Sequence, residues 1–338
     1  MQAVIKKHMC VMKMISTVIF VLFFMSCRGE TEASLSYNFY DQICPQVEHI
    51  IRAGVESASI GDPTTPSALL RLMFHDCQVQ GCDASILLEP HGHMTKFSEM
   101  ASSKSFGVRK RDFINLMKST VEAVCPQMVS CSDIIIMAAR EAVAFSGGPR
   151  INVPLGRRDT SNPPNFTLAD VSLPSPDVGV DEMLRIFAKH GMSIQDSVAI
   201  LGSHTLGITH CSNLESRLYN QQNRPGDEII NQAYENTLKL KCPHVGPTPS
   251  KFISFVQNDF TAVLFDNQYF VNSINGLGVL KIDTQMPLDS RTRPFVEKFA
   301  SDESAFFDAF SSAFVKLSRS NVLTGNQGVI RTSCNGLY

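Results

Sequence analysis

The feature that most constrains the fold of this chain is a set of eight cysteines that follow an apolar N-terminal segment. The segment opens with lysines, continues with an apolar run from about Met14 to Met25, and then turns small and polar, which is the order of a secretory signal peptide. The run is shorter than the ~20 apolar residues that span a bilayer, so an uncleaved membrane anchor is the weaker alternative. We expect a signal peptide over residues 1–29, with a boundary no later than residue 33.

The cysteines that remain after cleavage predict disulfide bonds. Two of the ten cysteines, Cys10 and Cys27, would leave with the signal peptide. An even number behind a signal peptide is typical of disulfides formed in an oxidising compartment, and the sequence alone leaves their pairing open. Buried free thiols would suit a cytosolic protein better, and the absence of C-x-x-C pairs argues against a structural zinc site. The eight are Cys44, Cys77, Cys82, Cys125, Cys131, Cys211, Cys242 and Cys334.

Composition and charge exclude several classes of protein. With 43% apolar and 18% charged residues, the 338-residue chain is neither disordered nor fibrous. Its length suits two domains or one large two-lobed unit. A net charge of −2 gives no reason to expect a nucleic acid or an anionic membrane as partner. The sequon that begins at Asn165 follows two prolines and predicts a surface loop that can be glycosylated.

Helical periodicity and capping signals dominate the chain, and they predict a mainly α fold. Thr65-Pro66 predicts the N-cap and the first residue of a helix that continues to His75. Ser193 followed by Asp196 predicts a capping box at the start of another helix. Phenylalanines recur at helical spacing over residues 306–317, which indicates a helix face that packs into the core.

The most informative segment is residues 71–88, where Arg71 and His75 are four residues apart and project from one face of a helix. Phe74 lies beside them. A guanidinium and an imidazole on an otherwise apolar helix are costly to bury unless they face a polar ligand. An imidazole can take and return a proton near neutral pH, and a guanidinium can stabilise developing negative charge. For either residue alone, a satisfied core histidine or a snorkelling arginine is the favoured interpretation.

A candidate cation site follows directly in the sequence. Two carboxylates, a hydroxyl and kinked backbone carbonyls can surround a hard cation such as Ca²⁺. The spacing differs from that of an EF-hand loop, and Cys77 and Cys82 bracket the segment. An ordinary acidic turn is the alternative interpretation. The candidate ligands are Asp76, Val79, Gly81, Asp83 and Ser85.

A further polar residue in an apolar setting is His204, which lies at the end of a predicted apolar helix, in the segment Leu201–Gly207. A lone histidine in such a place is more often a core residue than a ligand. An imidazole that binds a metal usually gives its second nitrogen to an acceptor. Asp283 is one of several candidate acceptors, and the sequence alone does not choose among them.

Together these segments resemble the secreted plant haem peroxidases, class III of the plant peroxidase superfamily. The similarity runs from about Leu35 to Cys334 and joins FHDC-x3-GCDAS to a downstream GSHTLG and to eight cysteines. Other matching stretches are NFYDQICP, VSCSDIIIMAAREAV, GGP, VPLGRRD, FDNQYF and RTSC. The resemblance implies a mainly α, two-lobed fold that holds haem between a distal lobe and a proximal lobe.

The resemblance also implies an organisation of the chain into lobes. The distal lobe would cover residues 30–178 and the proximal lobe residues 179–300, with a boundary in the Pro/Ser-rich stretch 173–177. A C-terminal segment, residues 301–338, would pack back on the distal lobe.

By this resemblance, His204 is the axial ligand of the haem iron, and Asp283 is the hydrogen-bond acceptor behind it. His75 is the distal acid–base residue, Arg71 stabilises the transition state, and Phe74 shields the haem edge. The larger sets are a distal calcium site of Asp76, Val79, Gly81, Asp83 and Ser85, a proximal calcium site of Thr205, Asp259, Thr261 and Asp266, and a substrate contact at Pro174. The implied disulfides are Cys44–Cys125, Cys77–Cys82, Cys131–Cys334 and Cys211–Cys242.

The activity implied is reduction of H₂O₂ to water, coupled to one-electron oxidation of phenolic donors in the response to oxidative stress and in cell-wall phenolic or lignin metabolism. One haem b and two Ca²⁺ per chain are implied as cofactors. His75 would take a proton from peroxide and return it to the outer oxygen, while Arg71 stabilises the charge on that oxygen. We expect a secreted, extracellular, monomeric glycoprotein without nucleic-acid or membrane partners. The vacuole is less favoured, because no long extension follows Cys334.

The sequence departs from the family pattern at several positions. Lys104 stands where the family has an asparagine bonded to the distal histidine, and a cation there would lower the basicity of His75. A glutamate of the same network is displaced, with Ser98 or Glu99 near its place. Further departures are Gln78 for phenylalanine, Ile151 for tryptophan in a chain without any tryptophan, and a segment 259–266 that is one residue shorter than usual, which affects Thr261 most.

Two alternatives belong to other classes of protein. The first is a haem-binding or structural extracellular protein with weakened peroxide turnover. Lys104 motivates it, and the presence of both His75 and Arg71 opposes it. The second is a calcium-dependent extracellular binding module without haem, in which His204 would be simply buried.

Overall fold

A computed structural model describes residues 34–89, 98–220, 231–244 and 253–336. The predicted signal peptide over residues 1–29, with its limit at residue 33, lies outside these residues, as do Cys10 and Cys27. Within the described ranges, no helix is long and apolar enough to cross a membrane.

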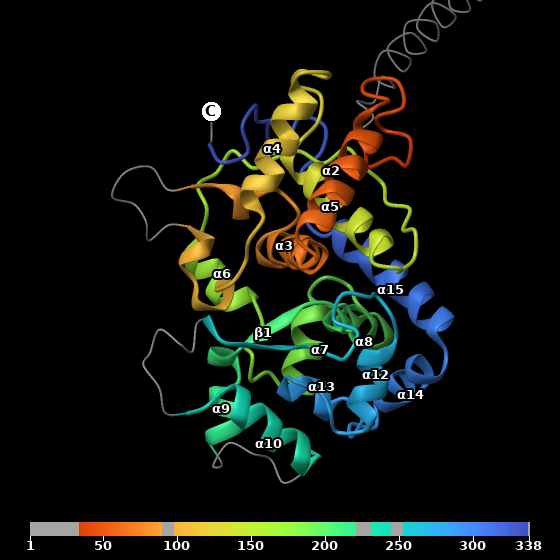
Figure 1. Cartoon of the computed structure of the whole chain (residues 1–338). Coiled ribbons are helices and arrows are strands. Elements are labelled where there is room, and N and C mark those ends of the chain that lie inside the picture. The colour runs from red at the N-terminus through yellow and green to blue at the C-terminus, as the bar shows by residue number, and fades with distance from the viewer. Residues whose placement is uncertain (1–33, 90–97, 221–230, 245–252, 337–338) are drawn as a thin grey trace, which may run out of the picture.

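The prediction of a mainly α fold is confirmed (Figure 1). The helices drawn in the upper half of Figure 1 are α2 (Val47–Gly61), α3 (Thr65–Val79), α4 (Arg111–Glu122), α5 (Cys131–Phe145) and α6 (Phe166–Ser172). The lower half holds α7 (Val180–Ala188), α8 (Ile194–Leu201), α9 (Glu215–Tyr219), α10 (Gln232–Lys241), α12 (Gln268–Ile274), α13 (Lys281–Gln285) and α14 (Arg293–Ser301). Helix α15 (Glu303–Ser318) runs along one side and contacts both α8 and α3.

Short elements connect the helices. The described strands are β1 (Ile208–His210) and β2 (Phe255–Gln257), which pair antiparallel with Thr209 opposite Val256. The 3-10 turns are η1 (Ser85–Leu87), η3 (Glu99–Ala101), η4 (Ser103–Ser105), η5 (Gly202–Thr205) and η6 (Cys211–Asn213).

Helix α5 is the central element of the upper half. Its apolar residues from Ile134 to Val143 are buried, including the consecutive Ile134, Ile135 and Ile136. A helix that is apolar all round must be covered all round, and α2, α3 and α4 pack against it. This packing fixes the orientation of α3, the helix that carries Arg71 and His75.

Phenylalanine rings fill the core of the other half. The predicted stripe on α15 is confirmed, because Phe306, Phe310 and Phe314 are fully buried. Phe306 packs edge-on against Phe270 of α12, with 5.0 Å between ring centroids, and also contacts Phe299 of α14. These contacts hold α12 and α15 around α8, which leads into the turn η5 that carries His204.

The observed N-cap agrees with the sequence prediction at α8 and differs from it at α3. Ser193 and Asp196 form the predicted capping box at α8, with the Asp196 amide 3.1 Å from the Ser193 hydroxyl. The predicted N-cap Thr65 is wrong by one residue, because α3 begins at Thr65 and its N-cap position is Thr64. The Thr65 hydroxyl instead donates to the carbonyl oxygen of Ala58 at the end of α2, a contact that only the folded chain provides.

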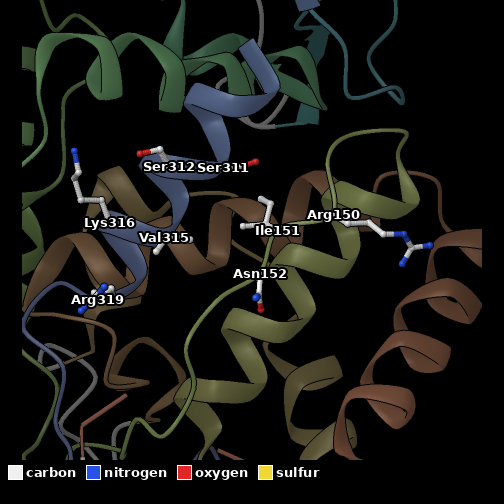
Figure 2. A pocket seen from close by; sticks show the side chains of 8 residues that line it. All are labelled: Arg150, Ile151, Asn152, Ser311, Ser312, Val315, Lys316 and Arg319. Atoms are coloured by element: carbon white, nitrogen blue, oxygen red, sulfur yellow. The ribbon is translucent and has the colours of Figure 1, made fainter. Parts of the chain in front are cut away.

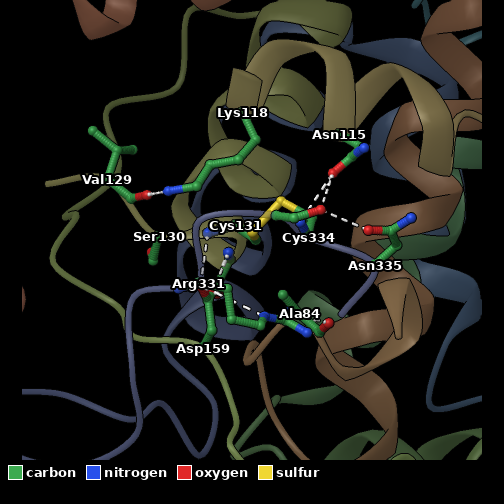
Figure 3. The surroundings of a disulfide bond; sticks show 12 residues. Ala84, Asn115, Lys118, Val129, Ser130, Cys131, Asp159, Arg331, Cys334 and Asn335 are labelled. Carbon is green, nitrogen blue, oxygen red and sulfur yellow. Dashed lines mark hydrogen bonds and ion pairs between the residues drawn. A yellow bond between two sulfur atoms is a disulfide. The ribbon is translucent and has the colours of Figure 1, made fainter. Parts of the chain in front are cut away.

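Four disulfides fasten the fold, and they join the pairs that the family resemblance implies. They are Cys44–Cys125, Cys77–Cys82, Cys131–Cys334 and Cys211–Cys242. Figure 3 shows that the bond between Cys131 and Cys334 lies beside Asp159, whose carboxylate accepts hydrogen bonds from the backbone amides of Cys131 and Arg331. The Arg331 guanidinium donates to the carbonyl oxygen of Ala84 at 2.7 Å. The C-terminal segment is therefore tied to the loop that follows α3.

Candidate active site

One cavity brings together residues that are far apart in the sequence. Arg71, Phe74 and His75 reach it from α3, His204 reaches it from η5, and Pro174 lies on its wall. The remaining wall is largely apolar and includes Leu70, Met73, Phe187, Ile200, Leu201, Leu206, Leu280 and Ile282. The four-residue spacing on α3 thus places Arg71 and His75 on one face, as predicted, and that face lines the cavity.

Arg71 and His75 touch directly. The Nε of Arg71 lies 3.2 Å from Nε2 of His75, and an Nη of Arg71 donates to the backbone carbonyl oxygen of Lys104. Burial, and then the positive charge of Arg71, lower the pKa of His75 well below its ordinary value. Burial lowers the pKa of Arg71 to about 10, which keeps the guanidinium cationic at neutral pH. The pair therefore presents a neutral imidazole beside a fixed positive charge.

Phe74 is half-buried beside this pair. Its ring packs edge-on against His75, with 6.0 Å between centroids, and against Phe187 of α7, with 6.1 Å. The ring therefore connects α3 to α7 within the cavity wall.

His204 is held by a carboxylate from a distant helix. Its Nδ1 lies 3.2 Å from Oδ1 of Asp283 in α13, and the Tyr269 hydroxyl donates to the same oxygen at 2.8 Å. Burial works to raise the pKa of Asp283, but the bonds from His204, the Leu280 amide and Tyr269 outweigh it and lower that pKa. Tyr269 was missed as a site residue by sequence reasoning, although it lies in the matching stretch FDNQYF.

These residues fit a haem. An imidazole whose Nδ1 is bonded to a carboxylate has its Nε2 available to a metal, and the carboxylate raises the basicity of that nitrogen. The His204 side chain is 29% exposed, whereas Asp283 behind it is 3% exposed. Largely apolar walls and the His204 imidazole, backed by a carboxylate, match a planar apolar cofactor with a central metal.

Lys104 does not point its charge at the distal histidine. Its Nζ lies 2.5 Å from the carbonyl oxygen of Asp170 and 2.6 Å from that of Leu173, both near the end of α6. The Nδ1 of His75 is buried and has no hydrogen-bond partner within the described residues. The lowered pKa of His75 comes from burial and Arg71, so the predicted influence of the Lys104 charge on that group is not what lowers it.

The loop after α3 has the features of a cation site. The Asp76 carboxylate accepts hydrogen bonds from the amides of Ala84 and Ile86, and Asp83 accepts one from the Ser85 amide. Burial, and then the charges of Asp83 and Glu99, raise the pKa of Asp76 well above its ordinary value. The Ser85 hydroxyl and both Glu99 carboxylate oxygens are buried without hydrogen-bond partners in the described ranges.

Glu99 is the residue of this group that sequence reasoning left undecided. It lies in η3, which packs against η1, and burial raises its pKa to about 8. A bound cation would satisfy buried carboxylate and hydroxyl oxygens that otherwise repel one another or have no partner. Among the predicted ligands, Val79 and Gly81 would contribute backbone carbonyl oxygens.

The four residues of the predicted proximal calcium site also lie together, Thr261 included. The Thr205 hydroxyl contacts the Asp259 carboxylate at 2.7 Å and the Asp266 carboxylate at 2.9 Å. The Thr261 hydroxyl lies 3.2 Å and 3.1 Å from the same two carboxylates. Burial raises the pKa of Asp259 to about 6, with the Asp266 charge acting in the same direction.

Each of the two acidic clusters combines carboxylates with hydroxyl groups. Within the described residues, no group of three or more His, Cys, Asp or Glu side chains has the geometry to hold a metal ion. A hard cation such as Ca²⁺ is compatible with this, because it takes hydroxyl and backbone carbonyl oxygens together with carboxylates.

A second cavity lies away from these residues, between Ile151 and α15 (Figure 2). Its volume of about 480 Å³ exceeds the about 250 Å³ of the first cavity, so size alone does not identify the site. Figure 2 shows the Arg150 side chain turned away from those of α15, and Lys316 pairs with Asp196. The described residues that line this cavity include no histidine and no acidic side chain.

The predicted glycosylation site is exposed at a helix start. Asn165 is the N-cap of α6, and its Oδ1 accepts a hydrogen bond from the Leu168 amide at 3.0 Å.

The similarity to known proteins covers all the residues that line the cavity. A family model described as Peroxidase matches residues 47–302. Peroxidase 29 of Arabidopsis thaliana is 52% identical over 302 residues, which cover 89% of this chain and 88% of the relative. Peroxidase 46 of the same plant is 38% identical over 95% of this chain and 97% of its own length. Peroxidase 12 is 40% identical over 89% of this chain and 82% of its own length.

Proposed function

Because this chain belongs to the plant haem peroxidase family and is a peroxidase, we propose that its cavity reduces H₂O₂ with Arg71 and His75 and oxidises phenolic donors. The observation that carries the proposal is the 3.2 Å contact between Arg71 Nε and His75 Nε2, in the cavity that His204 also lines. A neutral imidazole next to a guanidinium can move a proton while the guanidinium holds negative charge.

His204 would bind the haem iron through Nε2, and Asp283 would keep its Nδ1 hydrogen-bonded. A haem held by His204 would store the two oxidising equivalents that come from peroxide and would pass them to donors one electron at a time. The orientation of the His204 ring depends on Asp283, whose own position is fixed by Tyr269 and by the Leu280 amide. We expect one haem b per chain.

His75 would accept a proton from the inner oxygen of H₂O₂ at Nε2 and deliver it to the outer oxygen, which leaves as water. Arg71 would stabilise the negative charge on that outer oxygen while the bond between the two oxygens breaks. Acid–base help of this kind is typically worth ~10²–10⁴ in rate. Phe74 and the apolar walls would exclude bulk water from the proton transfer.

Calcium and disulfides would hold this geometry in an extracellular enzyme. The distal cluster begins at Asp76, the residue after His75, and the proximal cluster begins at Thr205, the residue after His204. Two Ca²⁺ ions would therefore fix the two ends of the cavity. The four disulfides suit an oxidising compartment, and we propose the cell wall as the location of a monomeric, secreted protein.

The two alternatives of other classes are not favoured. A haem-binding structural protein with weakened turnover would not need the Arg71–His75 contact, and the family and the relatives are peroxidases. A calcium-binding module without haem would not need His204 to line a cavity with Asp283 behind it.

The test uses haem-loaded, calcium-replete protein mixed with one equivalent of H₂O₂ in a stopped-flow spectrometer. We expect a rapid change of the haem absorption spectrum that guaiacol reverses in two one-electron steps. Protein that keeps its haem but shows no spectral change with peroxide would contradict the proposed function.

A further inference from the structure

The ammonium group of Lys104 is anchored near the end of α6 by two backbone carbonyls. Its Nζ lies 2.5 Å from the Asp170 oxygen and 2.6 Å from the Leu173 oxygen. An ammonium has three hydrogens to donate, and within the described residues only these two acceptors are bonded to it. Because carbonyl groups carry no net charge, this arrangement holds the ammonium in place without neutralising it.

Gln78, a second residue that departs from the family pattern, bonds the same part of the chain, the end of α6. The Nε2 of Gln78 donates to the Ser172 carbonyl oxygen at 3.3 Å, next to the two carbonyls that Lys104 bonds. The last carbonyls of a helix lack partners within it and attract positive charge. Lys104 and Gln78 together therefore fix the end of α6, from which the chain continues through Leu173 into Pro174.

Lys104 belongs to the cavity wall, and its ammonium bonds the carbonyl oxygen of Leu173, the residue before Pro174 on that wall. Lys104, Pro174, Ser175 and Pro176 all line the cavity that contains His75. Pro174 and Pro176 offer rigid apolar surface, and Phe74 adds an aromatic ring. An aromatic donor that packs on this surface would bring a polar substituent within reach of Lys104.

The charges around the cavity are one-sided. Among the described residues that line it there is no aspartate or glutamate, whereas Arg71, Lys104 and Arg109 are present. Arg109 is already paired with Asp62 at 3.2 Å, and Arg71 is bonded to His75.

The two nearby acids are also engaged. Glu182 of α7 pairs with Arg185 at 2.5 Å, and the Asp170 carboxylate accepts the Ser102 hydroxyl at 2.5 Å. Within the described residues, Lys104 and Arg71 are thus the cations on this wall without an acidic partner within ion-pair distance, and Arg71 is held by His75.

We propose that Lys104 makes this peroxidase select aromatic donors that carry a carboxylate over neutral aromatic donors. The inference rests on the proposed function of the cavity and adds the chemical class of the donor. The ring would pack on Pro174 and Pro176, and the carboxylate would take the remaining hydrogen of the Lys104 ammonium. Lys104, which replaces the family's asparagine, would then bind the carboxylate of the donor.

The test compares one acid with its ester. Donors are para-hydroxycinnamate and its methyl ester, which share the phenol and differ by one negative charge. We expect kcat/KM for the acid to exceed that for the ester by roughly fivefold, the upper range for an ion pair at the rim of a wet cavity. The ratio should fall as salt is raised, because ions screen the interaction.

Three variants separate charge from structure. Lys104→Gln keeps an amide that can bond the Asp170 and Leu173 carbonyls, and it should bring the ratio of acid to ester close to one. Because both donors are measured on the same variant, a general change in turnover cancels in the ratio. Lys104→Arg keeps the charge and should preserve most of the ratio. Lys189→Gln removes an exposed charge at the end of α7, outside the cavity, and should leave the ratio unchanged.

Binding to the resting enzyme gives a readout that does not depend on turnover. Calorimetric titration of haem-loaded protein with para-methoxycinnamate, which has no phenolic hydrogen, should show the same loss of affinity in Lys104→Gln. A ratio that Lys104→Gln leaves intact, while guaiacol is still oxidised, would overturn this inference alone.

The haem also carries carboxylates, and these are the other groups that could bind the Lys104 ammonium. If they occupied Lys104, Lys104→Gln would weaken haem retention and leave the ratio of acid to ester unchanged, which also overturns the inference. Failure of the wild-type protein to oxidise any donor would instead contradict the proposed function.

Discussion

The Nδ1 of His204 lies 3.2 Å from Oδ1 of Asp283, although 79 residues separate them in the chain. Asp283 is buried and accepts further bonds from Tyr269 and from the Leu280 amide, so its carboxylate cannot turn away from the imidazole without losing them. The pair gives the cavity one imidazole whose orientation and basicity are set by a fixed negative charge.

We predict that Asp283→Asn lowers haem affinity or peroxide turnover by about 10–100-fold, the usual effect of losing the partner of a metal-binding histidine. The amide keeps the shape of the carboxylate but removes its charge. Haem titration and the rate of reaction with H₂O₂ measure the two effects separately.

Two control variants accompany Asp283→Asn, one in contact with Asp283 and one away from the cavity. Tyr269→Phe leaves the charge of Asp283 and removes one of its bonds, so its effect should be smaller. Asp289→Asn changes an aspartate that pairs with Arg291 at 2.6 Å, away from the cavity, and should have no effect on either rate. Wild-type haem affinity and turnover in Asp283→Asn would contradict the role assigned to this residue.

Replacing the distal base should remove most of the reaction with peroxide. We expect His75→Leu to lower the second-order rate constant with H₂O₂ by ~10²–10⁴, because a leucine side chain can neither take nor return a proton. The same measurement on His49→Leu, which changes an exposed histidine of α2, is the control and should give the wild-type rate. A His75→Leu protein that binds haem and reacts at the wild-type rate would exclude His75 as the proton acceptor.

Removal of calcium should destabilise the protein. Calcium at about 100 times its Kd stabilises a site that forms only in the folded state by about 2.7 kcal/mol. We expect EGTA to lower the Tm and added Ca²⁺, but not Mg²⁺, to restore it, because Mg²⁺ requires a tighter octahedral shell. Differential scanning calorimetry measures the change.

Glu99→Gln tests the distal cluster within that experiment. Without calcium, the variant should raise the Tm, because it removes a buried carboxyl without a partner beside Asp76 and Asp83. The variant should also reduce the increase in Tm that Ca²⁺ produces. Glu56→Gln, which changes an exposed glutamate of α2, is the matched control. An unchanged response of Glu99→Gln to calcium would place Glu99 outside the cation site.

The capping box of α8 should make stability depend on acid pH. Burial works to raise the pKa of Asp196, but bonds from Lys316 and Ser193 outweigh it, and the pKa is lowered. A carboxyl whose pKa is lowered by folding stabilises the protein above its unfolded value of about 3.9, and this contribution is lost as pH falls through the folded value. We expect Asp196→Asn to lower the Tm at pH 7, and the difference from wild type to vanish near pH 2.

The companion variant Ser193→Ala should cost about 1 kcal/mol, the usual value for loss of an N-cap, and should do so with less dependence on pH. Thermal unfolding between pH 2 and pH 7 supplies both comparisons. A Tm difference for Asp196→Asn that persists at pH 2 would show that packing, and not charge, accounts for the effect.

The sequence by itself determined the features that depend on residues three or four positions apart. Helix α8 and its capping box follow from Ser193 and Asp196, and the shared face of Arg71 and His75 follows from their spacing on α3. These interactions form within one or two helical turns, so local sequence contains all the groups that make them. The resemblance to the plant haem peroxidases, confirmed by the comparisons, rests on such short segments as well.

Only the tertiary structure decided which distant groups meet. It selected Asp283 among the candidate partners of His204, brought Glu99 to the loop after α3, and assembled Thr261 with Asp259 despite the shortened segment. It also turned the Lys104 ammonium toward the end of α6, where sequence reasoning had expected it to act on His75. Contacts of this kind depend on how whole helices pack around α5 and α15, because that packing sets which side chains and carbonyl groups come within bonding distance.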